Sequence, residues 1–441
     1  MKPIKHIIKA RWVICADSEQ KVLENHALII HQGVIKDILP IDKLGEHEPT
    51  TQCIDYPHHV IMPGFINAHT HLGMNFFRGL GSDHALMDWL QKFMWPAEKQ
   101  WLSHEFVCDA TLFAMGEMIR SGTTCFNDMY FYPKAIAEAC DISGMRGSIG
   151  MHIHEFENNW ANTIDDCFLK GLEFYEEYKH HPLITPTWAP HSPYAISDQT
   201  FIRTQEMAEQ LDLKINLHLH ETEDEINHSL QNYKKRPIQR LYDLGFLSSR
   251  VIAIHSTCLN EEDLNIYAAT QPSIVHCPSA NLKLASGICP VKKLQTLGLT
   301  IALGTDSVCS NNDLNMINEM RSANFLSKIS TMNPLSLNAM DTIAMATMNG
   351  AKTLGNATQT GSLKIGKAAD FIAMDLDEIE TLPIFNIPAQ VVYASSRQQV
   401  TDVWVAGQQL MKDRVLLTLD ETDLKSKAHF WGDKITKGLS L

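Results

Sequence analysis

The stretch Pro63-Gly64-Phe65-Ile66-Asn67-Ala68-His69-Thr70-His71 ends a short apolar run with two histidines in an i, i+2 pair. On a β-strand, residues i and i+2 point to the same face, so both imidazoles leave the strand on one side. Two neutral imidazoles held side by side suit a divalent metal, with Zn–N distances of about 2.0–2.1 Å. Taken alone, the stretch also fits two solvent-facing histidines at a strand end. Its metal-binding interpretation therefore depends on the rest of the chain.

A second apolar run, Ile215-Asn216-Leu217, leads into His218-Leu219-His220-Glu221-Thr222. A glutamate three residues after a metal-binding histidine is a candidate proton shuttle, because it can take a proton from water at the metal and pass it on. The alternative is a polar strand-to-helix loop, in which Glu221 is stabilised by the positive end of the following helix.

Two further strand-like runs also end in polar residues. His255 closes the run that begins at Val251, and Asp306 follows the run that begins at Thr300. Each has an ordinary explanation, since a lone histidine is often a hydrogen-bonded core residue and an aspartate often caps a helix.

The middle of the chain alternates short apolar runs with longer stretches of helical periodicity, such as 105–120 and 198–211. Eight strand–helix alternations predict a (β/α)8 barrel, which needs about 250 residues and forms its active sites at the carboxyl ends of the strands. On one rim, His69, His71, His218 and Asp306 would surround a single metal, leaving a position open for water. The eight candidate strands start near Val60, Thr123, Arg146, Leu183, Lys214, Val251, Ser273 and Thr300.

Both ends of the chain are rich in short β-type runs with glycine turns, over 8–39 and 369–419. We expect the two ends to form one small β-sandwich domain, 1–58 with 362–441, beside a barrel that spans 59–361.

Composition excludes several classes of protein. The 441 residues are 44% apolar and carry 37 basic and 51 acidic side chains, a net charge of −14. An acidic chain does not suit phosphate-backbone binding, so we expect no nucleic-acid partner. Ten cysteines without a CxxC pair are typical of reduced thiols in a cytosolic protein. We find no signal peptide and no membrane span, and expect a soluble cytoplasmic protein.

PGFINAHTH, HLHET, the strand-end His255, LGTDS and the later Gly366-Lys367-Ala368-Ala369-Asp370 resemble the amidohydrolase superfamily, in that order along nearly the whole chain. Within it, the chain looks like the 5′-methylthioadenosine/S-adenosylhomocysteine deaminases, although parts of the pattern also occur in chlorotriazine hydrolases and other deaminases. The stretches behind this narrower likeness are 76–79 (FFRG), 95–98 (WPAE), 128–131 (DMYF), 189–194 (APHSPY) and 278–284 (PSANLKL).

The resemblance implies a zinc ion, one per subunit, held by His69, His71, His218 and Asp306. Binuclear relatives use a carboxylated lysine from the fourth strand, and the fourth strand here, 183–189, contains no lysine. Glu221 would protonate the ring nitrogen beside the reacting carbon. His255 would position the attacking hydroxide, and Asp306 would relay the water's proton to the leaving ammonia.

The resemblance also implies substrate contacts. Glu98 and His191 match the family's ribose-binding residues, although a solvated helix residue is the alternative for Glu98. Many relatives carry an arginine in the third-strand region that reaches toward the substrate tail, and Met151 stands at the apparent position here. Trp95, with Met74, Phe76 and Phe77, forms either an apolar wall for a thioether tail or plain core.

These observations favour a zinc-dependent deaminase that converts an adenosine derivative, 5′-methylthioadenosine, S-adenosylhomocysteine or adenosine, to the inosine analogue and ammonia. An amidohydrolase acting on a guanine, a pyrimidine or an s-triazine is the main alternative, and a non-catalytic scaffold is a third. The expected partner is a small-molecule nucleoside, and a homo-oligomer is left open. Among the remaining histidines, we expect His220 to support the site and His276 to be a packed rim residue.

Overall fold

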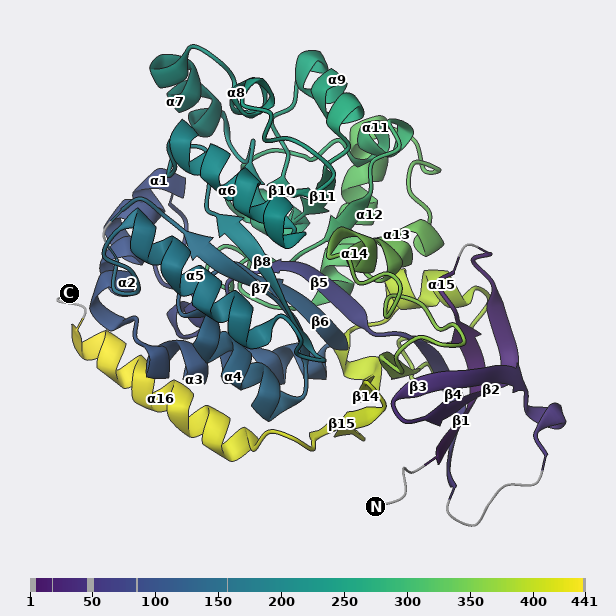
Figure 1. Ribbon diagram of the computed structural model, residues 1–441. Helices are drawn as coiled ribbons and strands as arrows, with labels where there is room; N and C mark the ends of the chain where they lie inside the picture. The colour runs from purple at the N-terminus through teal and green to yellow at the C-terminus, as the bar shows by residue number, and fades with distance from the viewer. Residues whose placement is uncertain (1–4, 18, 46–50, 85, 157, 439–441) are drawn as a thin grey trace.

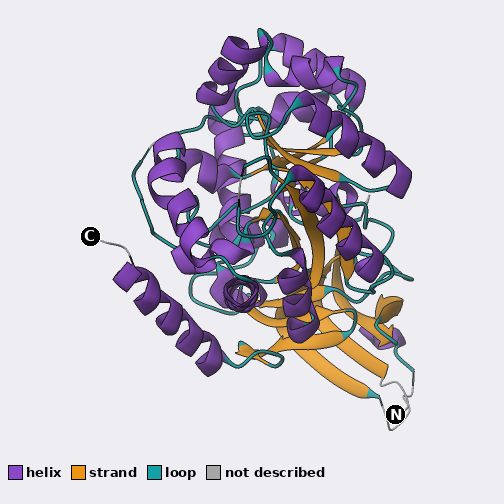
Figure 2. Cartoon of the chain, turned by 60° about the vertical axis from the view of Figure 1, so that its left-hand side comes forward, coloured by secondary structure: helices purple, strands orange, loops and turns teal. Residues whose placement is uncertain are grey.

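The computed structural model describes residues 5–17, 19–45, 51–84, 86–156 and 158–438. Parallel strands form a nearly closed barrel surrounded by helices, and a second sheet projects from one end (Figures 1 and 2). Neighbouring barrel strands follow chain order, and a single bridge between Thr70 and Asp306 joins the first strand to the segment after the last. The barrel strands are β5 (Phe65–Thr70), β6 (Thr123–Asp128), β7 (Arg146–Ile153), β8 (Ile184–Pro190), β9 (Ile215–Leu219), β10 (Val251–His255), β11 (Ser273–His276) and β12 (Ile301–Leu303).

The predicted barrel is confirmed, and seven of its strands begin within one residue of the expected position. The first differs, because β5 begins at Phe65 whereas Val60 lies in β4 (Gln52–Pro63), a strand of the second sheet. The apolar run from 60 to 70 is continuous in sequence, but the chain passes from one sheet to the other at Gly64. A Cβ at Gly64 would lie 2.1 Å from the side chain of Thr124, so the crossing point is tightly packed.

The helices lie outside the barrel strands (Figure 1). The predicted helical stretches appear as α3 (His104–Arg120) and α6 (Asp198–Leu211), and their N-caps Ser103 and Ser197 each accept a backbone N–H three residues on. The other helices are α1 (Leu86–Trp89), α2 (Trp95–Trp101), α4 (Pro133–Ser143), α5 (Ile164–Tyr178), α7 (Glu223–Tyr233), α8 (Pro237–Asp243), α9 (Glu261–Thr270), α10 (Pro278–Lys283), α11 (Val291–Thr296), α12 (Met316–Thr331), α13 (Ala339–Met345), α14 (Met348–Thr353), α15 (Ile387–Ala389) and α16 (Glu421–Gly438).

The second sheet is built from both ends of the chain, as predicted. Its eight strands follow one another in the order β16-β15-β14-β13-β4-β1-β2-β3, and the two ends meet where β13 pairs antiparallel with β4. One face buries Ile8, Leu28 and Trp404 in a core of its own, while Met62 and Ile372 on the other face join the main core. The strands not yet given are β1 (Lys5–Ile14), β2 (Val22–His31), β3 (Val34–Pro40), β13 (Phe371–Asp375), β14 (Val400–Val405), β15 (Gln408–Lys412) and β16 (Val415–Leu416).

After the second sheet, α16 returns along the barrel and lies against α3 (Figure 1). Trp431 anchors it, because its ring packs edge-on against Phe106 and its indole N–H donates to Asp109 over 3.0 Å. All ten cysteines are free thiols. In the described parts of the chain, no helix has the length and apolar character needed to cross a membrane.

Candidate metal and active site

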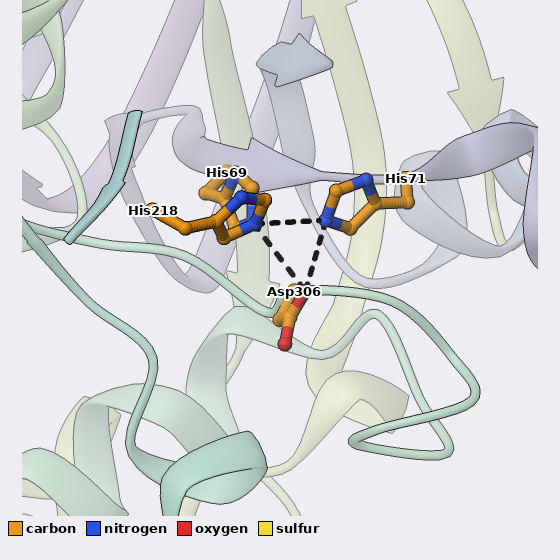
Figure 3. Close-up of side chains that lie close together, drawn as sticks. All are labelled: His69, His71, His218 and Asp306. Atoms are coloured by element: carbon orange, nitrogen blue, oxygen red, sulfur yellow. Dashed lines mark hydrogen bonds and ion pairs between the residues drawn. The ribbon is translucent and has the colours of Figure 1, made fainter. Parts of the chain in front are cut away.

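Four predicted ligands come together at the carboxyl ends of three barrel strands (Figure 3). His69 lies near the end of β5, and His71 directly follows that strand. His218 lies on β9, and Asp306 follows β12. The Nε2 atom of His218 is 3.1 Å from that of His69 and 3.3 Å from that of His71. Oδ1 of Asp306 lies 3.4 Å from Nε2 of His69 and 3.3 Å from Nε2 of His71.

These distances suit a metal ion. A tetrahedral ion with ligands at about 2.0–2.1 Å separates neighbouring ligand atoms by about 3.3–3.4 Å, close to the observed spacing. Backbone carbonyls fix the orientation of two of the rings. Nδ1 of His71 donates to the carbonyl of Met129 at 2.6 Å, and Nδ1 of His218 donates to the carbonyl of His191 at 2.8 Å. These bonds leave the Nε2 lone pairs directed at the shared centre.

Burial keeps two of the three imidazoles, those of His69 and His218, in the neutral form that binds metal, whereas for His71 the effect of burial is outweighed by the neighbouring Asp306, which raises its pKa. Burial lowers the pKa of His69 to about 4 and holds that of His218 well below its usual value. Burial alone would raise the pKa of Asp306, but its interactions with the neighbouring His69 and His71 rings hold that pKa well below the ordinary range. Two neutral imidazoles and an ionised carboxylate are therefore present around the centre at neutral pH.

The backbone at the rim adopts a conformation that most residues avoid. His255, Ser256 and Asp306 have φ angles of 75°, 50° and 61°, in the left-handed region. This conformation is uncommon for residues other than glycine, and it costs about 1–2 kcal/mol of free energy per residue. His255 is the last residue of β10, Ser256 follows it, and Asp306 follows β12. The sharp turns at these positions direct the His255 and Asp306 side chains into the cavity.

Glu221 and His255 lie beside the metal cluster. Glu221 is 7% exposed, and its Oε2 is 3.8 Å from Nε2 of His255. Burial raises the pKa of Glu221, and the His255 ring opposes that shift. Nδ1 of His255 lies 2.9 Å from Oδ1 of Asn281 on α10, which fixes the ring orientation. The carboxylate of Glu225, in the first turn of α7, accepts the backbone N–H of Glu221 at 2.8 Å and so holds its loop.

Glu98 reaches the same cavity from α2. The hydroxyl of Tyr130 donates to its Oε1 over 2.7 Å, so the carboxylate is held in place. Burial raises the pKa of Glu98 to about 7, although the Tyr130 bond opposes the shift. Glu98 is therefore not a solvated helix residue, because its carboxylate is paired with Tyr130 and lines the cavity.

The cavity has a volume of about 350 Å³, and five of the six predicted metal-binding or catalytic side chains line it, the exception being the fully buried His69. Glu98 and His191 also line it. Trp95 and Met74 belong to its wall. Phe76 and Phe77 instead pack against Phe106 of α3 and are core residues. The apolar remainder of the wall includes Trp89, Phe131, Phe156 and Trp160.

The structure corrects the expectation for the third barrel strand. Met151 points outward from β7 and is fully buried, with its Cβ beside Gly171 of α5. Strand alternation therefore turns His152, the next residue, toward the barrel interior. His152 and His154 both line the cavity, and Met151 does not. Met151 thus says nothing about recognition of a substrate tail.

Two other histidines are placed as parts of the scaffold. His220 accepts the backbone N–H of Ile238 on Nε2 at 3.1 Å and lies 3.1 Å from the carbonyl of Cys258 through Nδ1, so it fastens the loops behind Glu221. His276 is fully buried and is not among the residues that line the cavity.

Tyr130, Asn281 and Glu225 hold Glu98, His255 and the Glu221 loop, and the sequence motifs alone indicate no separate role for them. Tyr130 and Asn281 fall within the quoted stretches 128–131 and 278–284, but their side-chain partners are distant in sequence. Glu225 has a local signal, because Thr222 caps α7 and places Glu225 in its first turn.

Comparison with known proteins agrees with this site. The model of the Amidohydrolase family matches residues 60–410. A protein of Saccharophagus degradans named 5-methylthioadenosine/S-adenosylhomocysteine deaminase is 41% identical over 433 residues, covering 98% of this chain and 97% of the relative. A protein of the same name from Teredinibacter turnerae is 39% identical and covers 98% of each chain.

Solved structures of amidohydrolases superpose on nearly the whole chain. An adenosine deaminase from Xanthomonas campestris with bound zinc superposes with a TM-score of 0.96 at 39% identity, over 98% of both chains. Atrazine chlorohydrolase from Arthrobacter aurescens, at 20% identity and a TM-score of 0.90 over 97% of this chain and 100% of that chain, shares the fold. The family model spans most of the chain, and full-length relatives share over a third of its residues. The chain with this barrel and this His-His-His-Asp group therefore belongs to the amidohydrolase family.

Proposed function

We propose that this protein is a zinc-dependent deaminase that hydrolyses the 6-amino group of an adenosine derivative and releases ammonia. The observation that carries the proposal is the position of Glu221 and His255. They lie beside the four-ligand cluster, in the cavity that Glu98 also enters. Candidate acid–base groups, four candidate metal ligands and a carboxylate suited to a diol thus share one cavity.

His69, His71, His218 and Asp306 would hold one zinc ion per chain. A zinc ion bound there supplies a Lewis acid that activates water near neutral pH. The ligand set has three imidazoles and one carboxylate, and the described residues offer no lysine from the fourth strand that would hold a second ion.

The side chains around the metal divide the proton transfers. Glu221 delivers a proton to the ring nitrogen beside the reacting carbon, because its burial raises its pKa toward neutrality. The His255 ring, held at Nδ1 by Asn281, would use Nε2 to orient the water that attacks that carbon. The second oxygen of Asp306 accepts from Ser310 at 2.7 Å, so this carboxylate is also positioned to pass a proton to the departing amine.

The substrate class follows from the remainder of the cavity. Glu98 provides a fixed carboxylate for vicinal hydroxyls, where charge-assisted hydrogen bonds are strong. His191 adds a ring beside His218, at 4.7 Å between centroids. Relatives that match along nearly the full chain are named for 5-methylthioadenosine and S-adenosylhomocysteine, and the zinc-bound structural neighbour for adenosine.

The test is an ammonia-release assay on the zinc-loaded enzyme. The panel contains adenosine, 5′-methylthioadenosine, S-adenosylhomocysteine, guanine, cytosine and an amino-s-triazine. We expect release from one or more of the three adenosine derivatives and none from the free bases or the triazine. Release confined to guanine, cytosine or the triazine would replace this function with the alternative. A zinc-loaded enzyme inactive on the whole panel would contradict it.

A further inference from the structure

His152 is a buried histidine in the cavity that takes part in none of the roles described above. It lies near the carboxyl end of β7, is 2% exposed, and faces the cavity while Met151 and Ile153 face away. Both ring nitrogens are buried and have no hydrogen-bond partner among the described residues. Buried polar side chains are nearly always paired, so an unpaired ring in a cavity wall is suited to bind a ligand.

The unpaired state alone does not identify a binding residue, as His276 shows. It is fully buried on β11, and both of its ring nitrogens also lack a partner among the described residues. His276 does not line the cavity, whereas His152 does. The combination of an unpaired ring and a position in the cavity wall distinguishes His152.

The place of His152 indicates which part of a substrate it meets. Ring centroids lie 4.7 Å apart between His218 and His191, and 6.0 Å apart between His191 and His152. His152 is therefore separated from the metal ligand His218 by His191. His152 also packs against Phe131, with 4.4 Å between the ring centroids. A nucleoside with its purine at Glu221 and its ribose hydroxyls at Glu98 and His191 would extend its 5′ end toward His152.

The surroundings of His152 carry little charge. His154 stacks near it at 5.8 Å between centroids, and burial lowers the pKa of His154 to about 4. Phe156 and Trp160 continue the wall. Among the described residues that line the cavity, Lys99 is the only lysine or arginine, and it is exposed on α2.

We propose that His152 binds the 5′ end of the nucleoside through a hydrogen bond to a 5′ heteroatom, and that this part of the cavity favours an uncharged 5′ substituent. The proposal rests on the function proposed above. A neutral imidazole offers one N–H donor and one lone pair, which suits a 5′-hydroxyl. The zwitterionic tail of S-adenosylhomocysteine would enter the same region without buried countercharges.

The experiment compares adenosine with 5′-deoxyadenosine, which lacks the 5′ heteroatom. His152→Phe keeps an aromatic ring but removes both polar atoms. We expect kcat/KM for adenosine to fall by about 3–10-fold more than kcat/KM for 5′-deoxyadenosine, the range of one neutral hydrogen bond. His276→Phe is the matched control, and should leave the ratio of the two substrates unchanged. His152→Asn, which restores a donor and an acceptor, should recover part of the adenosine preference.

The outcomes are separable. Equal losses on both substrates in His152→Phe would overturn the contact with the 5′ end, provided that the wild type deaminates adenosine. If His152→Phe does not fold, the same comparison in His152→Asn and in His152→Leu decides. A wild type that uses S-adenosylhomocysteine as well as 5′-methylthioadenosine would overturn the preference for an uncharged substituent. Failure of the wild type on every nucleoside would instead count against the proposed function.

Discussion

Oε2 of Glu221 lies 3.8 Å from Nε2 of His255, with both side chains buried beside the metal cluster. His255 cannot rotate freely, because Nδ1 of its ring is paired with Asn281. The carboxylate and the imidazole therefore face one another across a fixed gap in the cavity. A water molecule or a substrate atom lying beside this pair could contact both the proton-carrying carboxylate and the oriented ring.

Glu221→Gln should separate chemistry from binding. The substitution keeps the size of the side chain but removes its ability to carry a proton. We expect the variant to retain zinc and to bind substrate, while kcat falls by at least ~100-fold, because general acid–base catalysis contributes about 10²–10⁴-fold. Zinc content, equilibrium binding of a nucleoside and single-turnover rates measure the three quantities.

The alternative role of Glu221, a residue favoured by the dipole of α7, predicts only about 0.3–1 kcal/mol of stability lost. A Glu221→Gln enzyme with wild-type turnover would contradict the proposed proton transfer for any substrate.

Asn281 is expected to act through His255 as a positioning residue. Asn281→Ala removes the partner of Nδ1 and should lower kcat by about 10–100-fold, the usual effect of losing such an orienting contact. Asn281→Asp keeps an acceptor at the same place and should recover much of the loss. A purely structural role would predict equal melting-temperature losses without that recovery. Steady-state kinetics with thermal unfolding on both variants distinguish the two.

His69→Ala should abolish metal binding and activity together. His69 is fully buried and supplies one of four ligand atoms, so two imidazoles and one carboxylate would remain. Elemental analysis of the purified wild type should give about one zinc per chain, and the variant should give almost none. His276→Ala removes an equally buried imidazole from the same barrel and should keep its zinc. Active wild-type enzyme without a stoichiometric transition metal would refute the assignment.

Glu98→Ala should weaken nucleoside turnover without removing the metal. A hydrogen bond to a charged group is worth roughly 1.5–3 kcal/mol, so kcat/KM on adenosine derivatives should fall by ~10–150-fold. Gln100→Ala, two residues along α2, exposed and outside the cavity lining, is the neighbouring control. A 2′,3′-dideoxy substrate should be almost insensitive to the Glu98 change. Equal losses of kcat/KM on substrates with and without the diol would contradict the contact between Glu98 and the ribose hydroxyls.

Glu98 should also make binding depend on pH. Its folded pKa is raised to about 7 by burial, so the carboxyl is protonated below that pH and ionised above it. The ionised form accepts hydrogen bonds from a diol, so KM for a nucleoside should fall as pH rises through about 7. The same shift makes this group's contribution to stability decrease between its ordinary pKa of 4.5 and about 7, because only the unfolded chain is ionised there.

Glu98→Gln cannot titrate, so its KM should lose this dependence. KM measured from pH 6 to 8.5 for both enzymes provides the test. An unchanged slope in the variant would assign the titration to another group.

The barrel and the clustering of the four candidate metal ligands could be predicted from local sequence. His69 and His71 occupy one face of one strand, and each of the other ligands follows its own apolar run. Barrel topology then places the carboxyl ends of all strands on one rim, so no distant contact had to be known.

Other features depend on contacts that sequence spacing does not encode. The bond from Tyr130 to Glu98 joins α2 to the loop after β6, and Asn281 reaches His255 from α10. On β7, a shift of one residue exchanges the inward and outward faces, so choosing Met151 instead of His152 reversed the interpretation. The boundary at Gly64 was missed because one apolar run serves two sheets.

The pairing of β13 with β4 also constrains how the chain is synthesised. Ile372 pairs with Met62, a separation of 372 − 62 = 310 residues. At about 5–20 residues per second, the ribosome needs roughly 15–60 s to deliver the second partner after the first. During that interval β4 has one edge unpaired, and an open strand edge invites association with other chains. A nascent chain halted shortly before residue 371 should therefore be more prone to aggregate than one extended past residue 416.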